Sequence, residues 1–291
     1  MKITKAVIPA AGFGTRFLPI TKAQPKEMIP IVDTPVIQYV VEEAVESGIT
    51  DILLIIGRGK RAVEEHFDRS FELENILSEK NMMAELAAIQ KITKMANIHF
   101  IWQKEMRGLG DAINHARYHV GNEPFAVLLG DTIARSSSGK PVTRQLMDVA
   151  EKYNSSVVAL EEVAPELISR YGIMDGTLID GNVLMANSFV EKPSRESAPS
   201  NLAIASRYIF TPDIFKYIDA TTPGKNNEIQ ITDAMSLLLK DHKMYGVKFD
   251  GQRYDIGHKL DFIKTNVIFG LEHEDIHENL RNWIKELAKS L

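Results

Sequence analysis

The amino-acid sequence predicts an α/β fold, in which a mostly parallel mixed sheet carries helices on both faces. Short apolar runs rich in β-branched residues alternate with longer helical patterns. The runs span residues 6–10, 51–56, 98–102 and 125–129. Helical patterns at residues 35–47 and 109–119 lie between them. This alternation is typical of βαβ units, whose ligands collect beyond the carboxyl ends of the strands.

Further elements follow in order along the chain. Residues 71–95 are polar and helical without a strand, and we expect a lid or an oligomer contact there. Residues 136–141 predict a mobile loop. Short strands dominate from Ser155 onward before helices return. The strands are expected at residues 157–160, 187–191 and 203–210, and the helices at 230–240 and 258–271.

Composition narrows the class of protein. The 291 residues are 44% hydrophobic and 25% charged, as in a globular protein with one large domain. A net charge of −5 gives no basic surface for nucleic acid, so any bound phosphate must be held by local cations. There are no cysteines, and we expect no signal peptide, no membrane span and a cytoplasmic location.

A glycine turn follows the first apolar run and leads into spaced cations and prolines at residues 9–30. Small residues let backbone N–H groups approach an anion, and cations supply the counter-charge. The small residues are Ala10, Ala11, Gly12 and Gly14, and the cations are Arg16, Lys22 and Lys26. The pattern predicts a loop that binds a polyphosphate.

Two common phosphate loops are disfavoured. A dinucleotide fingerprint needs a glycine at Phe17 and an immediate helix, but Pro19 and Pro25 forbid a continuous helix. A Walker loop needs Gly-x-x-x-x-Gly-Lys-Ser/Thr, which does not occur in the sequence. An ordinary strand-to-helix connection stays open for the glycines alone. The cations and prolines after them argue against it.

The apolar run at residues 125–129 ends in Gly130 and Asp131, which places a carboxylate at the edge of the predicted sheet. A hard oxygen ligand suits Mg²⁺, which takes one or two protein carboxylates besides waters and substrate phosphates. Asp255 is a second candidate. The alternative is that Asp131 only caps the following turn.

The glycine loop and several later blocks resemble the sugar-nucleotide pyrophosphorylase family. The family signature, Gly-x-Gly-Thr/Ser-Arg followed by a Pro-Lys pair, is found at residues 12–16 and 25–26. The chain is more similar to the bacterial-type uridylyltransferases within that family. The matching blocks lie at residues 25–28, 37–39, 57–60, 66–68, 72–74, 191–193, 228–234 and 254–257. Each block alone is weak, but their order over residues 3–270 is specific.

The resemblance implies a Rossmann-like nucleotide-diphospho-sugar transferase fold. It also implies a nucleotidyltransferase that makes UDP-glucose and pyrophosphate from UTP and glucose 1-phosphate, with Mg²⁺ as cofactor. The implied assembly is a homo-oligomer, a dimer or a tetramer. Within one domain, 1–291, we expect a nucleotide-binding part at about 1–135, a sugar-binding part at about 155–260 and a helical C-terminal segment at 271–291.

The resemblance also implies roles for single residues. The β- and γ-phosphates are expected on Arg16 and Lys26, and the metal on Asp131 and Asp255. The nucleotide contacts implied are Ala10, Ala11, Gly12, Gly14, Glu27, Gln103 and Gly108. The amide of Gln103 suits uracil because it offers a donor and an acceptor. The sugar contacts implied are Gly172, Glu191 and Lys192, with Lys192 binding the sugar phosphate.

Some details stay open. Pro193 favours extended backbone at Lys192, so the side chains of Glu191 and Lys192 are expected to diverge. Relatives usually carry histidine where Asp111 stands and a second aspartate where Thr132 stands. Both departures leave Asp131 in place but put finer nucleotide contacts in doubt.

Rival functions are also considered. A thymidylyltransferase that uses dTTP is separated only by the uridylyltransferase-like residues 57–74. A non-catalytic paralogue that binds nucleotide sugars would be expected to lose the charged catalytic positions, which are all present. A nicotinamide oxidoreductase needs an acid at a strand end about 20 residues beyond the glycines, whereas Asp33 lies in a proline-flanked turn. A His-Glu-x-x-His match at residues 273–277 has no buried apolar flank, and we interpret it as accidental.

Overall fold

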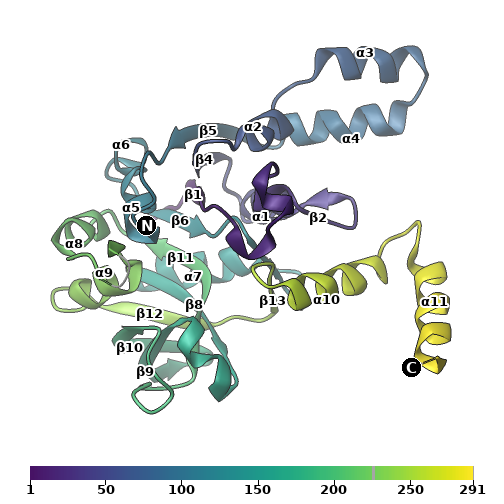
Figure 1. The fold of residues 1–291 in the computed structure, drawn as a ribbon. Helices are drawn as coiled ribbons and strands as arrows, with labels where there is room; N and C mark the ends of the chain where they lie inside the picture. The colour runs from purple at the N-terminus through teal and green to yellow at the C-terminus, as the bar shows by residue number, and fades with distance from the viewer. Residues whose placement is uncertain (225–226, 291) are drawn as a thin grey trace.

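A central sheet of nine strands organises the molecule (Figure 1). The computed structural model describes residues 1–224 and 227–290. The strands are β1 (Lys5–Ala10), β4 (Asp51–Ile56), β5 (Asn97–Trp102), β6 (Phe125–Leu128), β8 (Ser156–Glu162), β9 (Gly172–Asp180), β10 (Val183–Glu191), β11 (Leu202–Phe210) and β12 (Met244–Lys248). They lie in the order β5-β4-β1-β6-β11-β8-β12-β10-β9. The four apolar runs predicted as strands are therefore neighbours at one side of the sheet.

The four strands β5, β4, β1 and β6 pair in parallel, as the alternation of strands and helices predicts. A parallel sheet is covered on both faces, so β4 is apolar and buried along its length after Asp51. Successive side chains enter different cores: Ala6 and Ile8 join one apolar cluster, and Val7 joins the other.

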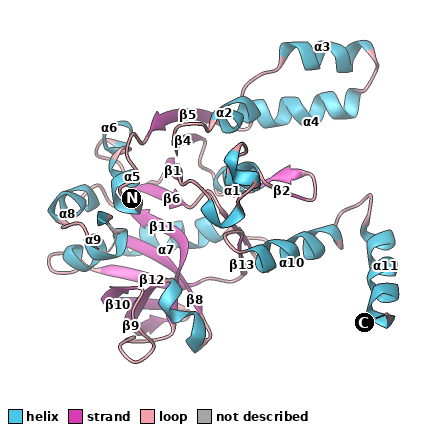
Figure 2. Ribbon diagram, viewed as in Figure 1, coloured by secondary structure: helices cyan, strands magenta, loops and turns pink. Residues whose placement is uncertain are grey.

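Helices cover both faces of the sheet, which confirms the predicted α/β class (Figure 2). One face carries α1 (Val36–Glu46), α2 (Arg61–Phe67) and α7 (Val142–Tyr153). The other carries α5 (Leu109–Asn114), α6 (Arg117–Val120), α8 (Ile214–Ala220) and α9 (Ile231–Leu238). The single helix expected at residues 109–119 is split into α5 and α6. There the Ala116 N–H bonds to the Ile113 carbonyl, which tightens the turn.

Beyond β6 the sheet is mixed. β11 runs antiparallel to β6 and β8, β12 runs parallel to β8, and β10 runs antiparallel to β12 and β9. The sequence did not predict β9 or β12 because both lack a strong alternating pattern. The pairing of β9 with β10 sets Gly172 opposite Glu191 at one end of the β9–β10 hairpin.

Two small sheets and a series of tight turns complete the region around the glycine loop. β2 (Pro30–Ile31) pairs with β3 (Thr34–Pro35), and β7 (Thr132–Arg135) pairs with β13 (Gln252–Asp255). Between β1 and β2 the chain forms three 3₁₀ turns, η1 (Thr15–Phe17), η2 (Ile20–Lys22) and η3 (Lys26–Met28). As the prolines predict, no continuous helix forms in this described segment.

Four helices lie at the periphery. α3 (Phe71–Glu79) and α4 (Met83–Lys94) form a hairpin that projects from the body of the molecule (Figure 1), so the helical prediction for residues 71–95 is confirmed. α10 (Lys259–Gly270) packs on β13, and α11 (His277–Lys289) follows it. A further 3₁₀ segment, η4 (Pro165–Arg170), precedes β9.

Residues 225–226 of the expected sugar part and residue 291 of the C-terminal segment lie outside the described residues. Among the described helices, none has the length and apolar character needed to cross a membrane.

Candidate active site

A cavity of about 290 Å³ opens beyond the carboxyl ends of β1 and β6, where parallel sheets usually bind ligands. The glycine loop, the segment after β5 and the start of α5 surround it. Its lining includes the residues Ala10, Ala11, Gly12, Lys26, Glu27, Gln103, Gly108 and Asp131. The structure therefore brings most of the expected nucleotide contacts together with one of the expected metal ligands.

Two glycines allow the loop after β1 to close on the side chain of Lys26. Gly14 has a φ of 64°, and a Cβ at this position would lie 2.9 Å from Lys26 Cβ. At Gly12 the Lys26 Nζ atom lies 3.7 Å from the place a Cβ would occupy. The backbone of Gly12 and the ammonium group of Lys26 thus face the same space, an arrangement suited to an anion.

Lys26 and Asp131 form an ion pair inside the cavity. Lys26 Nζ lies 2.5 Å from Asp131 Oδ2, and both side chains are about three-quarters buried. Burial alone would lower the pKa of Lys26, but Asp131, Glu27 and Asp255 outweigh it and raise that pKa. Burial alone would raise the pKa of Asp131, but Lys26 and then Arg16 outweigh it and lower that pKa. Both groups therefore stay charged at neutral pH.

Asp255 reaches the same region through the small β7–β13 sheet. The Ile256 N–H donates to the Asp131 carbonyl at 3.3 Å, so the two aspartate segments are joined directly. The Tyr171 hydroxyl donates to the Asp255 carboxylate at 3.3 Å. The two carboxylates expected to hold a metal thus lie on neighbouring segments, although they are 124 positions apart in the sequence.

Two arginines flank this pair of aspartates. Arg16 is exposed on η1, and its Nη1 atom lies 3.3 Å from the place a Cβ on Gly257 would occupy. The side chain of Arg253 is 7% exposed and forms ion pairs with Glu161 and, at 3.6 Å, with Asp255. Arg16 is thus open to solvent beside the aspartates, whereas Arg253 contacts a carboxylate from within the protein.

A second ion pair at the cavity joins Glu27 to Lys60. Lys60 Nζ donates to Glu27 Oε2 at 2.6 Å and to the Gly12 carbonyl at 2.8 Å. Burial raises the pKa of Glu27 and lowers that of Lys60, and their mutual attraction offsets only part of each shift. Glu27 is fully buried, and its Oε1 atom has no hydrogen-bond partner among the described residues. Such an atom beside a cavity is a natural acceptor for a ligand N–H or O–H.

Gln103 follows β5 directly and is 4% exposed. Its Nε2 atom donates to Asp111 Oδ2 at 2.7 Å and to the Gly108 carbonyl at 3.4 Å. Gly108 has a φ of 96°, and a Cβ there would lie 2.8 Å from the Ile229 carbonyl oxygen, so only glycine fits. The two expected base contacts, Gln103 and Gly108, are thus held against one another.

The expected sugar contacts lie together at the end of the β9–β10 hairpin. Glu191 pairs with Gly172, and Glu191 Oε2 accepts a hydrogen bond from the Thr232 hydroxyl at 2.7 Å. The predicted divergence of Glu191 and Lys192 is wrong, because Lys192 Nζ lies 2.9 Å from Glu191 Oε1. Lys192 has a φ of 42° rather than an extended backbone, and the turn brings the two charges together.

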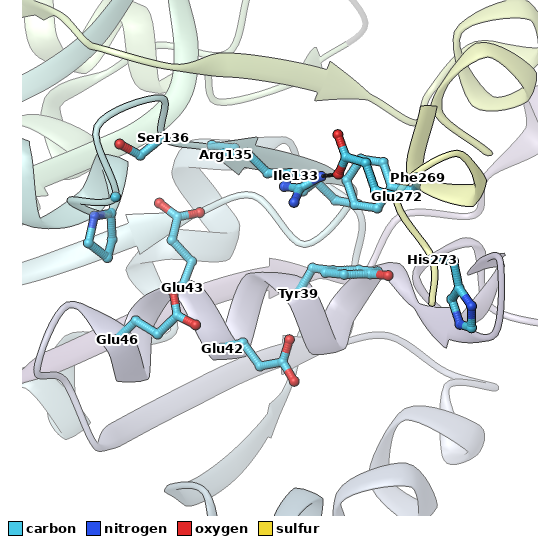
Figure 3. A pocket seen from close by; sticks show the side chains of 13 residues that line it. Tyr39, Glu42, Glu43, Glu46, Ile133, Arg135, Ser136, Phe269, Glu272 and His273 are labelled. Carbon is cyan, nitrogen blue, oxygen red and sulfur yellow. Dashed lines mark hydrogen bonds and ion pairs between the residues drawn. The ribbon is translucent and has the colours of Figure 1, made fainter. Parts of the chain in front are cut away.

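A larger cavity of about 430 Å³ is not the candidate site. It is lined by α1, β7 and the end of α10 (Figure 3). Glu42, Glu43 and Glu46 of α1 lie on one side of it, and the Arg135–Glu272 ion pair lies on the other. Within the described chain, none of the expected site residues lines it. An acidic cavity of this kind is unsuited to phosphate groups.

Two groups of histidines lie away from the candidate site. Among the described residues, one group of three side chains has the proximity that a metal needs, namely Asp51, His99 and His119. It lies at the amino-terminal edge of β4, away from the ends that form the cavity. His119 Nε2 and Asp51 Oδ1 are 2.9 Å apart, so a hydrogen bond between them explains why these side chains lie close together. The His-Glu-x-x-His match at residues 273–277 lies in the turn before α11 and ends at the first residue of that helix, so its two histidines do not share a helical face.

Comparison with known proteins identifies the family. Residues 5–269 match the family model for nucleotidyl transferases. The chain belongs to the nucleotidyl transferase family. A curated relative from Staphylococcus haemolyticus, named UTP--glucose-1-phosphate uridylyltransferase, is 50% identical to this nucleotidyl transferase over 99% of both chains. The family resemblance of the sequence is confirmed.

Solved structures agree with the family and with the fold. A UDP-glucose pyrophosphorylase in complex with UDP-glucose is 44% identical, with a TM-score of 0.87 over 94% of this nucleotidyl transferase and 100% of that chain. The UTP-bound UGPase from Acinetobacter baumannii is 36% identical, with a TM-score of 0.91 over 98% of this chain and 100% of that chain. The predicted Rossmann-like nucleotidyltransferase fold is confirmed.

Sequence reasoning missed some polar residues of this nucleotidyl transferase. Lys60 lies in one of the family blocks, but nothing in the block indicated that it would pair with Glu27. Arg253 stands two residues before Asp255, and its only signal was this proximity to a candidate ligand. Asp111 was noted as a departure from relatives, and its contact with Gln103 emerges only from the structure.

Proposed function

We propose that this nucleotidyl transferase makes UDP-glucose and pyrophosphate from UTP and glucose 1-phosphate. The observation that supports this most is the Lys26–Asp131 ion pair, which lies beside a glycine loop in a cavity also lined by Gln103. The cavity thereby offers a cation for the phosphates, a carboxylate for a metal and an amide for a pyrimidine. The names of the relatives point to the same substrates.

The proposed reaction is an in-line displacement at phosphorus. A phosphate oxygen of glucose 1-phosphate forms a bond to the α-phosphorus of UTP. The bond from that phosphorus to the bridging oxygen breaks, and pyrophosphate leaves with the electron pair. The protein positions the reactants and neutralises charge, and no covalent enzyme intermediate is needed. Arg16 and Lys26 bind the β- and γ-phosphates, and Lys26 suits this role because its raised pKa keeps it charged.

Asp131 and Asp255 fit Mg²⁺ by their chemistry. Both offer hard carboxylate oxygens on joined segments, and Asp131 already binds a cation, the ammonium group of Lys26. Bound there, Mg²⁺ supplies charge neutralisation at the α-phosphate. Arg16 and Lys26 remain the protein's own cations for the departing pyrophosphate.

We assign nucleotide binding to about residues 1–135 and sugar binding to about residues 155–260. In the first part, Ala10, Ala11, Gly12, Gly14 and Glu27 hold the nucleotide, and Gln103 and Gly108 read its base. In the second, Gly172 and Glu191 contact the sugar, and Lys192 binds its phosphate. The hydrogen bond from the Ile256 N–H to the Asp131 carbonyl joins the two parts. A cytoplasmic homo-oligomer, a dimer or a tetramer, is proposed on the support of the family alone.

The assignment is tested by incubating the purified protein with glucose 1-phosphate, Mg²⁺ and each nucleoside triphosphate in turn, with dTTP included. Pyrophosphate release is measured. We expect release with UTP well above that with any other nucleotide, and loss of release when a chelator removes Mg²⁺. Equal or greater release with dTTP indicates a thymidylyltransferase. Absence of release with every nucleotide supports a non-catalytic nucleotide-sugar-binding protein.

A further inference from the structure

The geometry points to Asp111 as the residue that makes the site accept uracil and reject cytosine. Asp111 acts through Gln103 as a positioning residue and does not itself touch the base. This inference rests on the proposed function, because it takes Gln103 as the group that meets the pyrimidine. It concerns the choice of base, which the fold and the phosphate contacts leave undetermined.

Asp111 holds the amide of Gln103 from behind. Gln103 lines the cavity, whereas Asp111 lies outside the described lining, in the first turn of α5 with its side chain 14% exposed. The Gln103 Nε2 atom donates to Asp111 Oδ2 at 2.7 Å. Its second contact, to the Gly108 carbonyl, is longer at 3.4 Å. Both groups that face Nε2 are acceptors.

These two acceptors determine which way round the amide lies. An ionised carboxylate and a carbonyl accept hydrogen bonds and cannot donate them. If the amide of Gln103 were turned over, Oε1 would face both oxygens and Nε2 would lose a charge-assisted hydrogen bond. The Gly108 carbonyl cannot move away easily, because Gly108 is packed against the Ile229 backbone. The carbonyl oxygen of Gln103 is therefore fixed on the branch away from Asp111.

Uracil and cytosine differ in the pattern that this amide meets. Uracil has an N3–H donor beside its O4 acceptor, and cytosine has an N3 acceptor beside an amino donor. The fixed amide matches uracil: Oε1 accepts from N3–H, and the hydrogen that is held only weakly by Gly108 is available for O4. Cytosine needs the amide turned over, which Asp111 opposes.

The same reasoning predicts what Asp111 does not select. Thymine carries the same N3–H and O4 pattern as uracil, so dTTP and UTP are alike to the amide. Asp111 therefore sets the preference for UTP over CTP and leaves the ratio of UTP to dTTP unaffected. This difference separates a positioning role from general damage to the site, which would lower activity with all three nucleotides.

The test compares the parent with Asp111→Asn, using UTP, CTP and dTTP in steady-state assays with glucose 1-phosphate. Asparagine keeps the shape but can either donate or accept, so the amide of Gln103 can turn. We expect the ratio of kcat/KM for UTP to that for CTP to fall about 10- to 150-fold, the weight of a hydrogen bond to a charged group. The UTP to dTTP ratio should stay within about twofold. Asp219→Asn, at a half-exposed surface ion pair, is the matched control and should leave both ratios as in the parent.

A second measurement uses the parent alone and stands if the variant does not fold. UTP methylated at N3 lacks the proton that Oε1 accepts, so it should be used as poorly as CTP. Efficient use of N3-methylated UTP, an unchanged UTP to CTP ratio in a folded Asp111→Asn variant, or an equal loss with all three nucleotides would each overturn the inference. Failure of the proposed function looks different, because the parent itself would then release no pyrophosphate from UTP.

Discussion

Two buried ion pairs contact the segments that form the site, and they differ in how completely they are satisfied. Arg207 donates to Glu43 Oε2 through Nε at 2.9 Å and through Nη2 at 2.6 Å. The guanidinium also donates to the carbonyls of Ser206 and Thr132, at 3.0 and 2.8 Å. The Glu43 Oε1 atom accepts from the backbone and hydroxyl of Thr143. Every oxygen of this carboxylate has a partner.

The Glu27–Lys60 pair is equally buried but is incomplete. Glu27 Oε1 lacks a partner among the described residues and lies at the cavity. A buried polar atom without a hydrogen bond costs free energy, so it persists where something outside the chain completes it. The burial of a charged pair therefore does not by itself mark a binding site. The satisfied pair fixes the backbone beside Asp131, and the incomplete pair is available to a ligand.

The largest expected effect is on stability, at the satisfied pair. Replacing Arg207 by methionine leaves the Glu43 carboxylate buried without a counter-ion, which should lower the free energy of unfolding by about 3–5 kcal/mol. Urea denaturation followed by circular dichroism measures this loss. The double variant Arg207→Met with Glu43→Leu removes both charges and should recover much of the stability. An exposed ion pair contributes up to about 1 kcal/mol. A loss below that value in the single variant would show that solvent reaches the carboxylate.

The next effect is on activity. Asp131→Asn removes the charge that pairs with Lys26 and the oxygen proposed for Mg²⁺, so kcat/KM should fall about 100-fold or more, as when a transition-state charge loses a partner. The dependence of the rate on Mg²⁺ concentration should weaken as well. Asp180→Asn, at an exposed ion pair with Lys152, is the matched control. If Asp131→Asn folds and turns over like the parent, Asp131 is a turn cap and the metal assignment is wrong.

The sequence predicted the fold better than it predicted the contacts. The parallel strands and the glycine loop leave strong local patterns, because burial on both faces demands apolar runs and close approach to an anion demands small residues. The Lys26–Asp131 pair joins residues 105 positions apart, and no periodicity indicates such a contact. The turn at Lys192 escaped prediction because a residue before proline usually stays extended. Local rules therefore gave the elements and the candidate residues, while tertiary packing decided which side chains meet.

The smallest effect tests the incomplete pair directly. Glu27→Gln keeps an acceptor for Lys60 but removes the charge, so kcat/KM for UTP should fall about tenfold, the weight of one charge-assisted hydrogen bond. Stability should change by only about 1 kcal/mol, because the lost attraction is offset by relief of a buried charge. Parallel assays and urea titrations of the parent and variant measure both quantities.

The same variant also tests the direction in which pH changes the stability of the protein. Burial raises the pKa of Glu27 above its ordinary value of 4.5, so the folded state holds this proton more tightly than the unfolded state. The stabilising contribution of the group is complete below that value and is lost as pH rises through the folded pKa. The parent should therefore lose stability relative to Glu27→Gln when urea titrations are repeated from about pH 4 to pH 7. A relative gain over this range would mean that the attraction of Lys60 outweighs burial. Glu27 would then be a satisfied structural pair like Glu43, and the contrast between the two pairs would fail.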